Sequence, residues 1–173
     1  MSPVCRAFAM YCLLSIVATA CLADEADDYL QDGQLKHEVS FSHLQLGGFA
    51  GRLETSISIN KDGSWKAGSG VGGRLKESSG KLNADQMRQL SEAFAEHGVT
   101  ELPRTIGSDK PVKSPRQIAD GASTTIKLTF GEHVTTANTA DGVAMDETAR
   151  TQFSRLRQIE KVLRQLTVNA AAQ

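Results

Sequence analysis

Hydrophobic and polar residues alternate in several short stretches after residue 38, which is the pattern of half-buried β-strands. The first stretch contains Val39 and Phe41, and then Leu44 and Leu46 at positions of the opposite parity. A change of parity moves the apolar side chains to the other side of a strand, unless one extra residue is inserted. The sequence therefore predicts a strand with a bulge or a bend between the two pairs.

Two hairpins are predicted further along the chain. Residues 52–70 alternate around an Asp62-Gly63 turn, and Ile126, Leu128 and Phe130 alternate before a Gly131-Glu132 turn that leads into a return strand. Between them, residues 68–80 contain five glycines and three serines. That composition predicts a continuing but irregular strand, or a loop.

Two segments have the spacing of amphipathic helices. The first spans about 84–97, with Asn83 and Gln86 placed as a capping box and Gly98 as a left-handed stop. The second runs from about 146 to 166. Its apolar residues recur three or four positions apart: Ala149, Phe153, Leu156, Ile159, Leu163 and Leu166.

The order of these elements is strand, strand, strand, helix, strand, strand, helix. It predicts an α+β domain over 37–168, in which an antiparallel sheet of four to five strands carries both helices on one face. An acidic leader, 24–36, precedes this domain, and a short tail, 169–173, follows it. A proline-bearing loop is expected over 104–121.

The first 23 residues have the features of an export signal. Arg6 is followed by seventeen uncharged, mostly apolar residues that end in Cys21-Leu22-Ala23. Cleavage after Ala23 predicts a periplasmic or secreted protein. The alternative is a weak lipobox that ends at Cys21, whose lipidation would anchor the protein in a membrane. An uncleaved signal is the other possible membrane anchor.

Composition and charge exclude some functions. The chain of 173 residues has 19 basic and 20 acidic side chains, so it lacks the positive charge that nucleic-acid binding requires. All three cysteines lie at or before Cys21, so the domain is expected to fold without disulfides. The four histidines never occur at the spacing of metal ligands and are expected at the surface, so no metal or cofactor is predicted.

No enzyme motif occurs in a suitable context. Residues 68–73 match G-x-G-x-x-G, but no helical pattern follows them, as a nucleotide site would require. His37-Glu38 is followed by His43, which is too distant for a zinc-peptidase motif. Glu160 and Arg164 have the spacing of an ion pair on a solvated helix face. The sequence thus favours a protein that is not an enzyme.

One combination of motifs resembles a known family. The string Leu46-Gly47-Gly48-Phe49-Ala50-Gly51 is followed by a helix that ends in Glu96-His97-Gly98, by Thr100-Glu101-Leu102-Pro103, and by Ile126-Lys127-Leu128-Thr129-Phe130 before the closing helix. Over about 41–166 this order resembles the emfourin family of protealysin inhibitors. The resemblance implies a small α+β protein whose partner is a thermolysin-like zinc metalloprotease.

The resemblance suggests a site on the loop formed by Gly47, Gly48, Phe49, Ala50 and Gly51. Glycines permit close approach of an enzyme surface, and Phe49 would enter an apolar pocket of the protease and occlude its active-site cleft. Two alternatives remain open. Phe49 is a core residue in one of them, and in the other the protein is a non-catalytic cell-envelope binding module with a different ligand.

Overall fold

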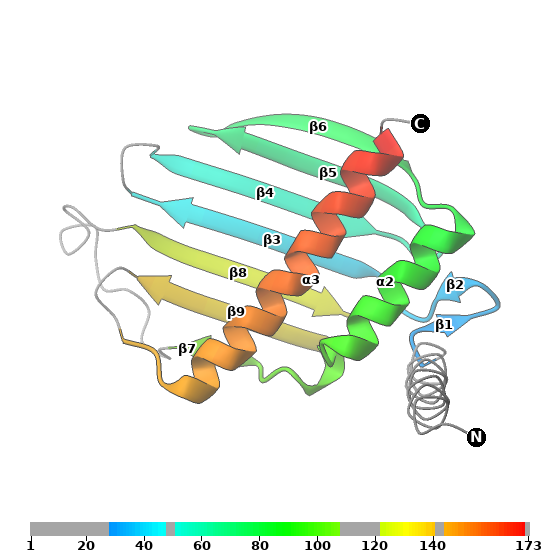
Figure 1. Ribbon diagram of the computed structural model, residues 1–173. Helices are drawn as coiled ribbons and strands as arrows, with labels where there is room; N and C mark the ends of the chain where they lie inside the picture. Colours follow the sequence, from blue (N-terminus) through cyan, green and yellow to red (C-terminus); the bar gives the residue numbers. More distant parts are fainter. Residues whose placement is uncertain (1–27, 48–50, 108–121, 141–143, 172–173) are drawn as a thin grey trace, which may run out of the picture.

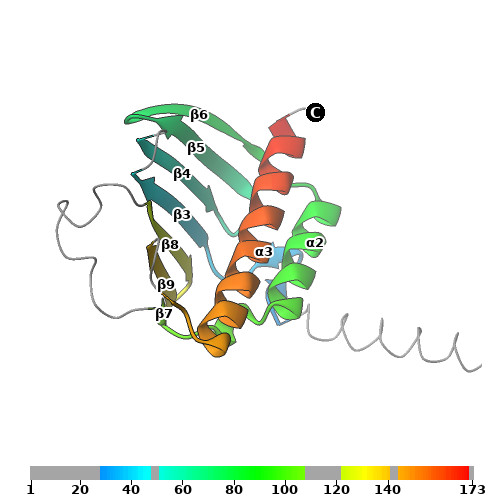
Figure 2. The same ribbon diagram turned by 60° about the vertical axis from the view of Figure 1, so that its left-hand side comes forward.

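The computed structural model describes residues 28–47, 51–107, 122–140 and 144–171, which form two layers (Figure 1). One layer is a seven-stranded sheet, and the other consists of helices α2 (Ala84–Glu96) and α3 (Glu147–Ala171). Figure 2 shows both helices on the same side of the sheet. The prediction of an α+β fold with two helices on one face of an antiparallel sheet is confirmed.

The sheet has more strands than the four to five expected. Its order is β6-β5-β4-β3-β8-β9-β7, and all neighbours are antiparallel except β7 and β9. The strands are β3 (Val39–Leu46), β4 (Arg52–Ile59), β5 (Ser64–Val71), β6 (Arg74–Lys81), β7 (Thr105–Gly107), β8 (Ser123–Phe130) and β9 (His133–Ala140).

The sequence did not predict strand β7, and for the segment that contains β6 it left open an irregular strand or a loop. All eight residues of β6 are exposed, so this edge strand has no buried face to produce an alternating pattern. Strand β7 has only three residues and lies within the first part of the proline-bearing loop expected over 104–121. Residues 108–121 of that loop lie outside the described residues.

The predicted bulge in β3 is wrong. Its eight residues pair without interruption with β4 on one side and with β8 on the other. Val39 and Phe41 point to the helices and are buried, whereas Leu44 and Leu46 point to the open side of the sheet. The change of parity therefore reflects apolar residues on both faces of one regular strand.

The core lies between the helices and the sheet and begins before residue 37. A small hairpin, β1 (Leu30–Gln31) and β2 (Gln34–Leu35), places Tyr29 and Leu35 in it. The largest fully buried side chains include Trp65, Phe41, Phe94, Ile59, Leu90, Ile126, Leu128, Leu156 and Ile159. The two helices contribute the apolar stripes that their spacing predicted.

Local hydrogen bonds fix the ends of several elements. The Asn83 side chain accepts from the Gln86 backbone N–H, and the Gln86 side chain accepts from the Asn83 N–H, both at 2.9 Å. Gly98 has φ +55° and ends the helix as expected. Asp62 accepts hydrogen bonds from the hydroxyl and the backbone N–H of Ser64, which lower the pKa of Asp62 to about 2. These contacts explain why α2 and the β4–β5 turn were predicted correctly.

Candidate functional site

The loop of the suggested partner-binding site connects β3 to β4. Leu46 pairs with Arg52 at the end of the hairpin, and the backbone N–H of Gly47 donates to the carbonyl of Gly51 at 3.1 Å. Both glycines have positive φ, +93° and +69°, which other residues adopt only with strain. Gly48, Phe49 and Ala50 lie outside the described residues, so the exposure of Phe49 stays a prediction.

The β5–β6 turn lies beside this loop. The backbone N–H of Gly72 donates to the carbonyl of Arg52 at 2.8 Å and joins the two turns. Strand β8 begins and β9 ends at the same end of the sheet, because Ser123 pairs with both Leu46 and Ala140. The ends of six strands, β3, β4, β5, β6, β8 and β9, and two hairpin turns therefore meet at this end of the molecule.

Three large hydrophobic side chains are exposed at this end. Leu46 is 38% exposed, Val71 57% and Leu75 42%, and they are the exposed large hydrophobic residues of the part of the chain that the structure describes. Leu46 and Leu75 point to the open side of the sheet, whereas Val71 points to the helix side, so the three side chains surround the strand ends on both faces. We call Leu46, Gly47, Gly51, Val71 and Leu75 the tip surface.

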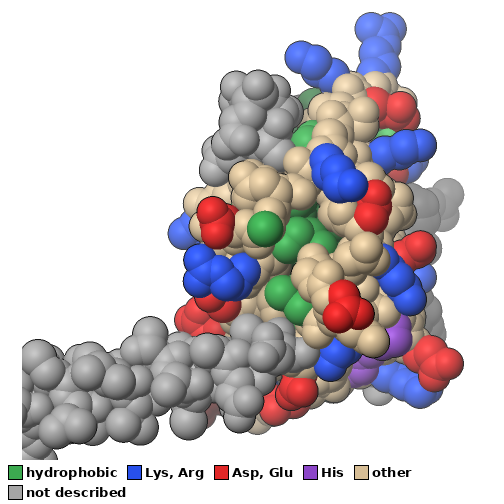
Figure 3. Space-filling model, turned by 90° about the vertical axis from the view of Figure 1, so that its right-hand side faces the viewer, with side chains coloured by type: hydrophobic (Ala, Val, Ile, Leu, Met, Phe, Trp, Pro, Cys, Tyr) green, Lys and Arg blue, Asp and Glu red, His purple; other side chains and the backbone are tan. Residues whose placement is uncertain are grey.

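The opposite end of the molecule has a different character. Figure 3 views the end where α2 and the β1–β2 hairpin lie, and it shows basic and acidic side chains interspersed around a small hydrophobic area. Mixed charges of this kind are ordinary for a solvated protein surface. The tip surface is thus the more distinctive end of the described chain.

A buried ionic cluster lies between α3 and the sheet. Glu160 on α3 is only 3% exposed, and its Oε1 accepts from the Nδ1–H of His43 on β3 at 2.7 Å. Arg157 and Arg164 also donate to Glu160, one to each carboxylate oxygen, and Arg164 donates to the Thr55 hydroxyl on β4 at 2.9 Å. The cluster therefore joins α3 to two central strands.

The Glu160 carboxylate is held in its charged form. Burial raises its pKa, but the hydrogen bonds from His43 and Arg164 and the nearby positive charges outweigh this effect and lower it below the ordinary value of 4.5. The charged Glu160 carboxylate accepts several hydrogen bonds at this position, and it is the electrostatic link between the two layers.

Two expectations about this cluster were wrong. His43 was expected at the surface, yet its side chain is 14% exposed and bonded to Glu160. Glu160 was expected on a solvated helix face, yet it is buried. One signal was available, because Glu160 lies four residues after Leu156 and three before Leu163, within the apolar stripe of α3.

The cluster has no catalytic partner in the described residues. Within the described residues, the Nδ1 atom of His43 contacts the Glu160 carboxylate and the guanidinium groups of Arg157 and Arg164, and these contacts include no hydroxyl or thiol nucleophile. The described residues contain no group of three or more His, Cys, Asp or Glu side chains that could hold a metal ion. None of the helices within the described ranges is long and apolar enough to cross a membrane.

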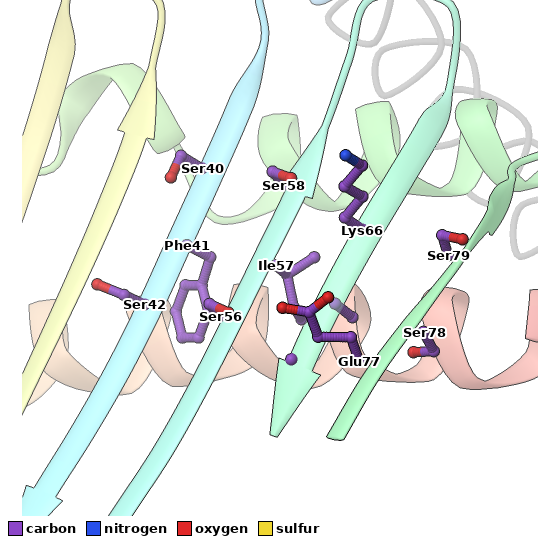
Figure 4. Close-up of a pocket in the computed structure, with 12 residues that line it drawn as sticks. Ser40, Phe41, Ser42, Ser56, Ile57, Ser58, Lys66, Glu77, Ser78 and Ser79 are labelled. Atoms are coloured by element: carbon purple, nitrogen blue, oxygen red, sulfur yellow. The ribbon is translucent and has the colours of Figure 1, made fainter. Parts of the chain in front are cut away.

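The open face of the sheet has a shallow hollow of about 430 Å³. Figure 4 shows Ser40 and Ser42 on β3, Ser56 and Ser58 on β4, Lys66 on β5 and Glu77 on β6 around it. Ser40, Ser58 and Lys66 are cross-strand neighbours, on the side away from the buried Phe41 and Ile57. Hydroxyl groups therefore dominate this surface.

Comparisons with known proteins give no relative for this chain: no protein-family model matches it, and no curated protein matches it significantly.

Proposed function

We propose that this protein is an exported inhibitor of thermolysin-like zinc metalloproteases, and that it acts by occluding the active-site cleft. The observation that carries the proposal is the tip surface, where the exposed large hydrophobic residues lie beside the Gly47–Gly51 loop. The choice of target rests on the resemblance of the sequence to the emfourin family. Export rests on the signal-like residues 1–23.

The backbone of the tip surface suits an occluding inhibitor. The loop base is closed by the hydrogen bond between Gly47 and Gly51, and the bond from Gly72 to Arg52 braces it against the neighbouring turn. A braced loop base loses little conformational entropy when a partner binds.

The side chains of the tip surface suit a protein interface. The centre of such an interface is apolar, and the strand ends beside the loop supply apolar area on both faces of the sheet, from Leu46 and Leu75 on the open side and from Val71 on the helix side. Arg52 and Arg74 lie at the same strand ends and supply polar contacts for a rim. Occlusion requires no chemistry from the inhibitor, so the proposal needs no catalytic residue.

An inhibition assay tests the proposal. The protein, recovered after export, is titrated against thermolysin-like proteases with a short fluorogenic peptide as substrate, and inhibition is expected. Val71→Ser should weaken inhibition about tenfold or more, because this side chain is exposed and would be buried by the protease. Val134→Ser, near the opposite end of the sheet, is the matched control and should inhibit like the wild type.

Two results would contradict the proposal. One is the absence of inhibition of every thermolysin-like protease tested. The other is equal inhibition by the wild type and the Val71→Ser variant, provided that circular dichroism shows both to be folded, because the tip surface would then lie outside the interface.

A second candidate function is a non-catalytic cell-envelope binding module, and the hydroxyl-lined hollow on the open sheet face favours it. Hydroxyls with one lysine and one glutamate suit a polyhydroxylated ligand, since each group can donate or accept hydrogen bonds. Binding of soluble cell-wall glycan fragments would be measured for the wild type and for Ser56→Leu, which narrows the hollow. Loss of binding in this variant, without any protease inhibition by the wild type, would favour the binding module.

A further inference from the structure

A second cavity lies on the helix side of the sheet, between the C-terminal half of α3 and strands β4, β5 and β6. Its volume is about 300 Å³. Thr55, Ser69 and Lys76 form one cross-strand row of its wall, and Arg164 of α3 faces this row through its hydrogen bond to Thr55. This cavity is distinct from the tip surface and from the hollow on the open face.

The polar wall of this cavity is positively charged. Among the described residues, Lys76 and Arg164 are the only charged ones that line it, and no carboxylate does so. The nearest carboxylate in the cluster, Glu160, is already shared by His43, Arg157 and Arg164. Lys76 takes part in no ion pair among the described residues. Arg164 is already paired with Glu160, so Lys76 is the cationic group of this cavity that no carboxylate of the described residues neutralises.

The remaining wall offers hydroxyls and an apolar floor. Ser69 and Ser78 line the cavity beside Lys76, and their hydroxyls are exposed on β5 and β6. Ile57 and Ala67 are cross-strand neighbours in the next row and supply apolar surface. Most binding sites for small molecules combine a largely apolar wall with a few polar groups, in volumes from about 300 Å³ upward.

We propose that this cavity binds a small organic anion, a carboxylate on a short apolar body. Lys76 and Arg164 neutralise the carboxylate, Ser69 and Ser78 donate hydrogen bonds to it, and the body of the ligand packs against Ile57 and Ala67. The ligand contacts both layers of the fold, so its binding also stabilises β6 against α3. The proposal of this anion site does not rest on the proposed function as a protease inhibitor.

Isothermal titration calorimetry with hexanoate tests the proposal on the full exported protein. Hexanol has the same apolar body without the charge, and acetate has the charge without the body. Hexanoate is expected to bind with one molecule per protein, and the other two compounds at least about tenfold more weakly, because each lacks one of the two matched features.

Two lysine variants locate the site. Lys76→Gln should weaken hexanoate binding about tenfold, because it removes one of the two cationic groups from the wall. Lys127→Gln is the control, since Lys127 is also an exposed lysine, but it lies on the open face of β8 and lines neither this cavity nor the open-face hollow. It should bind hexanoate like the wild type.

Three results would overturn the proposal. The first is hexanoate binding that is no tighter than that of hexanol. The second is unchanged binding in Lys76→Gln, which would place the site elsewhere. The third is equal weakening in Lys127→Gln, which would indicate a general effect of protein charge.

Discussion

Three cationic or protonatable side chains converge on Glu160: His43, Arg157 and Arg164. Removing the charge from such a buried carboxylate leaves its partners without a counter-charge in a region of low dielectric. The two arginines are partly exposed, so water takes over some of that role. Glu160 is thus the residue at which a single charge matters most for the stability of this fold.

Glu160→Gln is expected to lower the free energy of unfolding by about 3 kcal/mol at pH 7. The folded-state pKa of Glu160 is lowered, so the wild type has this stabilisation above about pH 4.5 and loses it as the pH falls through the folded-state pKa. The difference between wild type and variant should therefore shrink in acid. Urea unfolding at pH 7 and at pH 3 measures it.

A matched control separates this effect from a general loss of negative charge. Glu92 pairs with Arg88 on the exposed face of α2. Glu92→Gln should cost less than about 0.5 kcal/mol at either pH. Equal losses in the two variants, or a Glu160→Gln loss that does not change with pH, would contradict the assignment of a charged Glu160 in the fold.

Phe49→Ala distinguishes the two interpretations of the Gly47–Gly51 loop. If Phe49 contacts the protease, its truncation should weaken inhibition by about 2 kcal/mol of binding with little change in stability. A core phenylalanine would instead cost about 3 to 5 kcal/mol of stability. Thermal melting and inhibition are measured on the same variant. A large fall in Tm would make Phe49 a core residue, and unchanged inhibition would remove the loop from the interface.

Among the elements, those with a strong local signal were predicted best. Helix α2 has its capping box and its Gly98 stop, and the β4–β5 turn has Asp62 and Ser64. Strand β6 has no such signal. It pairs with β5 through its backbone, and all of its residues are exposed. An edge strand of this kind depends on tertiary pairing, which a hydrophobic pattern does not encode.

Strand β6 nevertheless has one position with a strict steric requirement. Gly80 pairs with Trp65, and a Cβ at Gly80 would lie 2.8 Å from Cζ2 of the buried indole ring. Gly80→Ala should destabilise the protein by about 1 to 3 kcal/mol, because the ring must shift in a closely packed core. Ser79→Ala, on the same strand but on the open face, is the control and should have little effect. Chemical denaturation measures both, and equal stabilities would show that the Trp65 ring adapts at no cost.

For the molecule as a whole, the sequence predicted the layers but not the electrostatic link between them. The layers follow from alternation and helical stripes, which depend on residues close in sequence. The link between His43 and Glu160 joins residues 117 positions apart, and only the fold brings them together. The tip surface could not be predicted from the sequence for the same reason, because Leu46, Val71 and Leu75 come from three strands.

The domain is expected to fold without disulfides or metal. The cysteines precede residue 22, and no three His, Cys, Asp or Glu side chains of the described residues form a group that could hold a metal ion. The Tm of the exported protein should therefore be the same with and without a reductant, and with and without a chelator. Differential scanning calorimetry checks this, and a fall of more than a few degrees in either condition would refute it.

Intact-mass analysis of the exported protein tests the prediction for residues 1–23. Cleavage near Ala20 or Ala23 is expected, and a first residue of Asp24 would support a soluble product. A diacyl or triacyl mass on Cys21 would support the lipoprotein alternative instead. A mass that begins at Met1 would contradict both forms of processing.

Burial decreases along the central strands from the α2 end toward the tip surface. On the helix side of β5, the exposed fraction rises from 2% at Trp65 to 57% at Val71, and on β3 and β4 the buried Val39 and Ile59 are followed on the same face by the half-buried Gln45 and Leu53. Amide hydrogen exchange should reflect this gradient. Amides near Val39 and Ile59 should exchange only when the whole domain unfolds, and those near Leu46 and Val71 by local fraying. A protease that covers the tip surface would slow hydrogen exchange most at those frayed amides. The slowed amides would therefore identify the strand residues that the protease contacts.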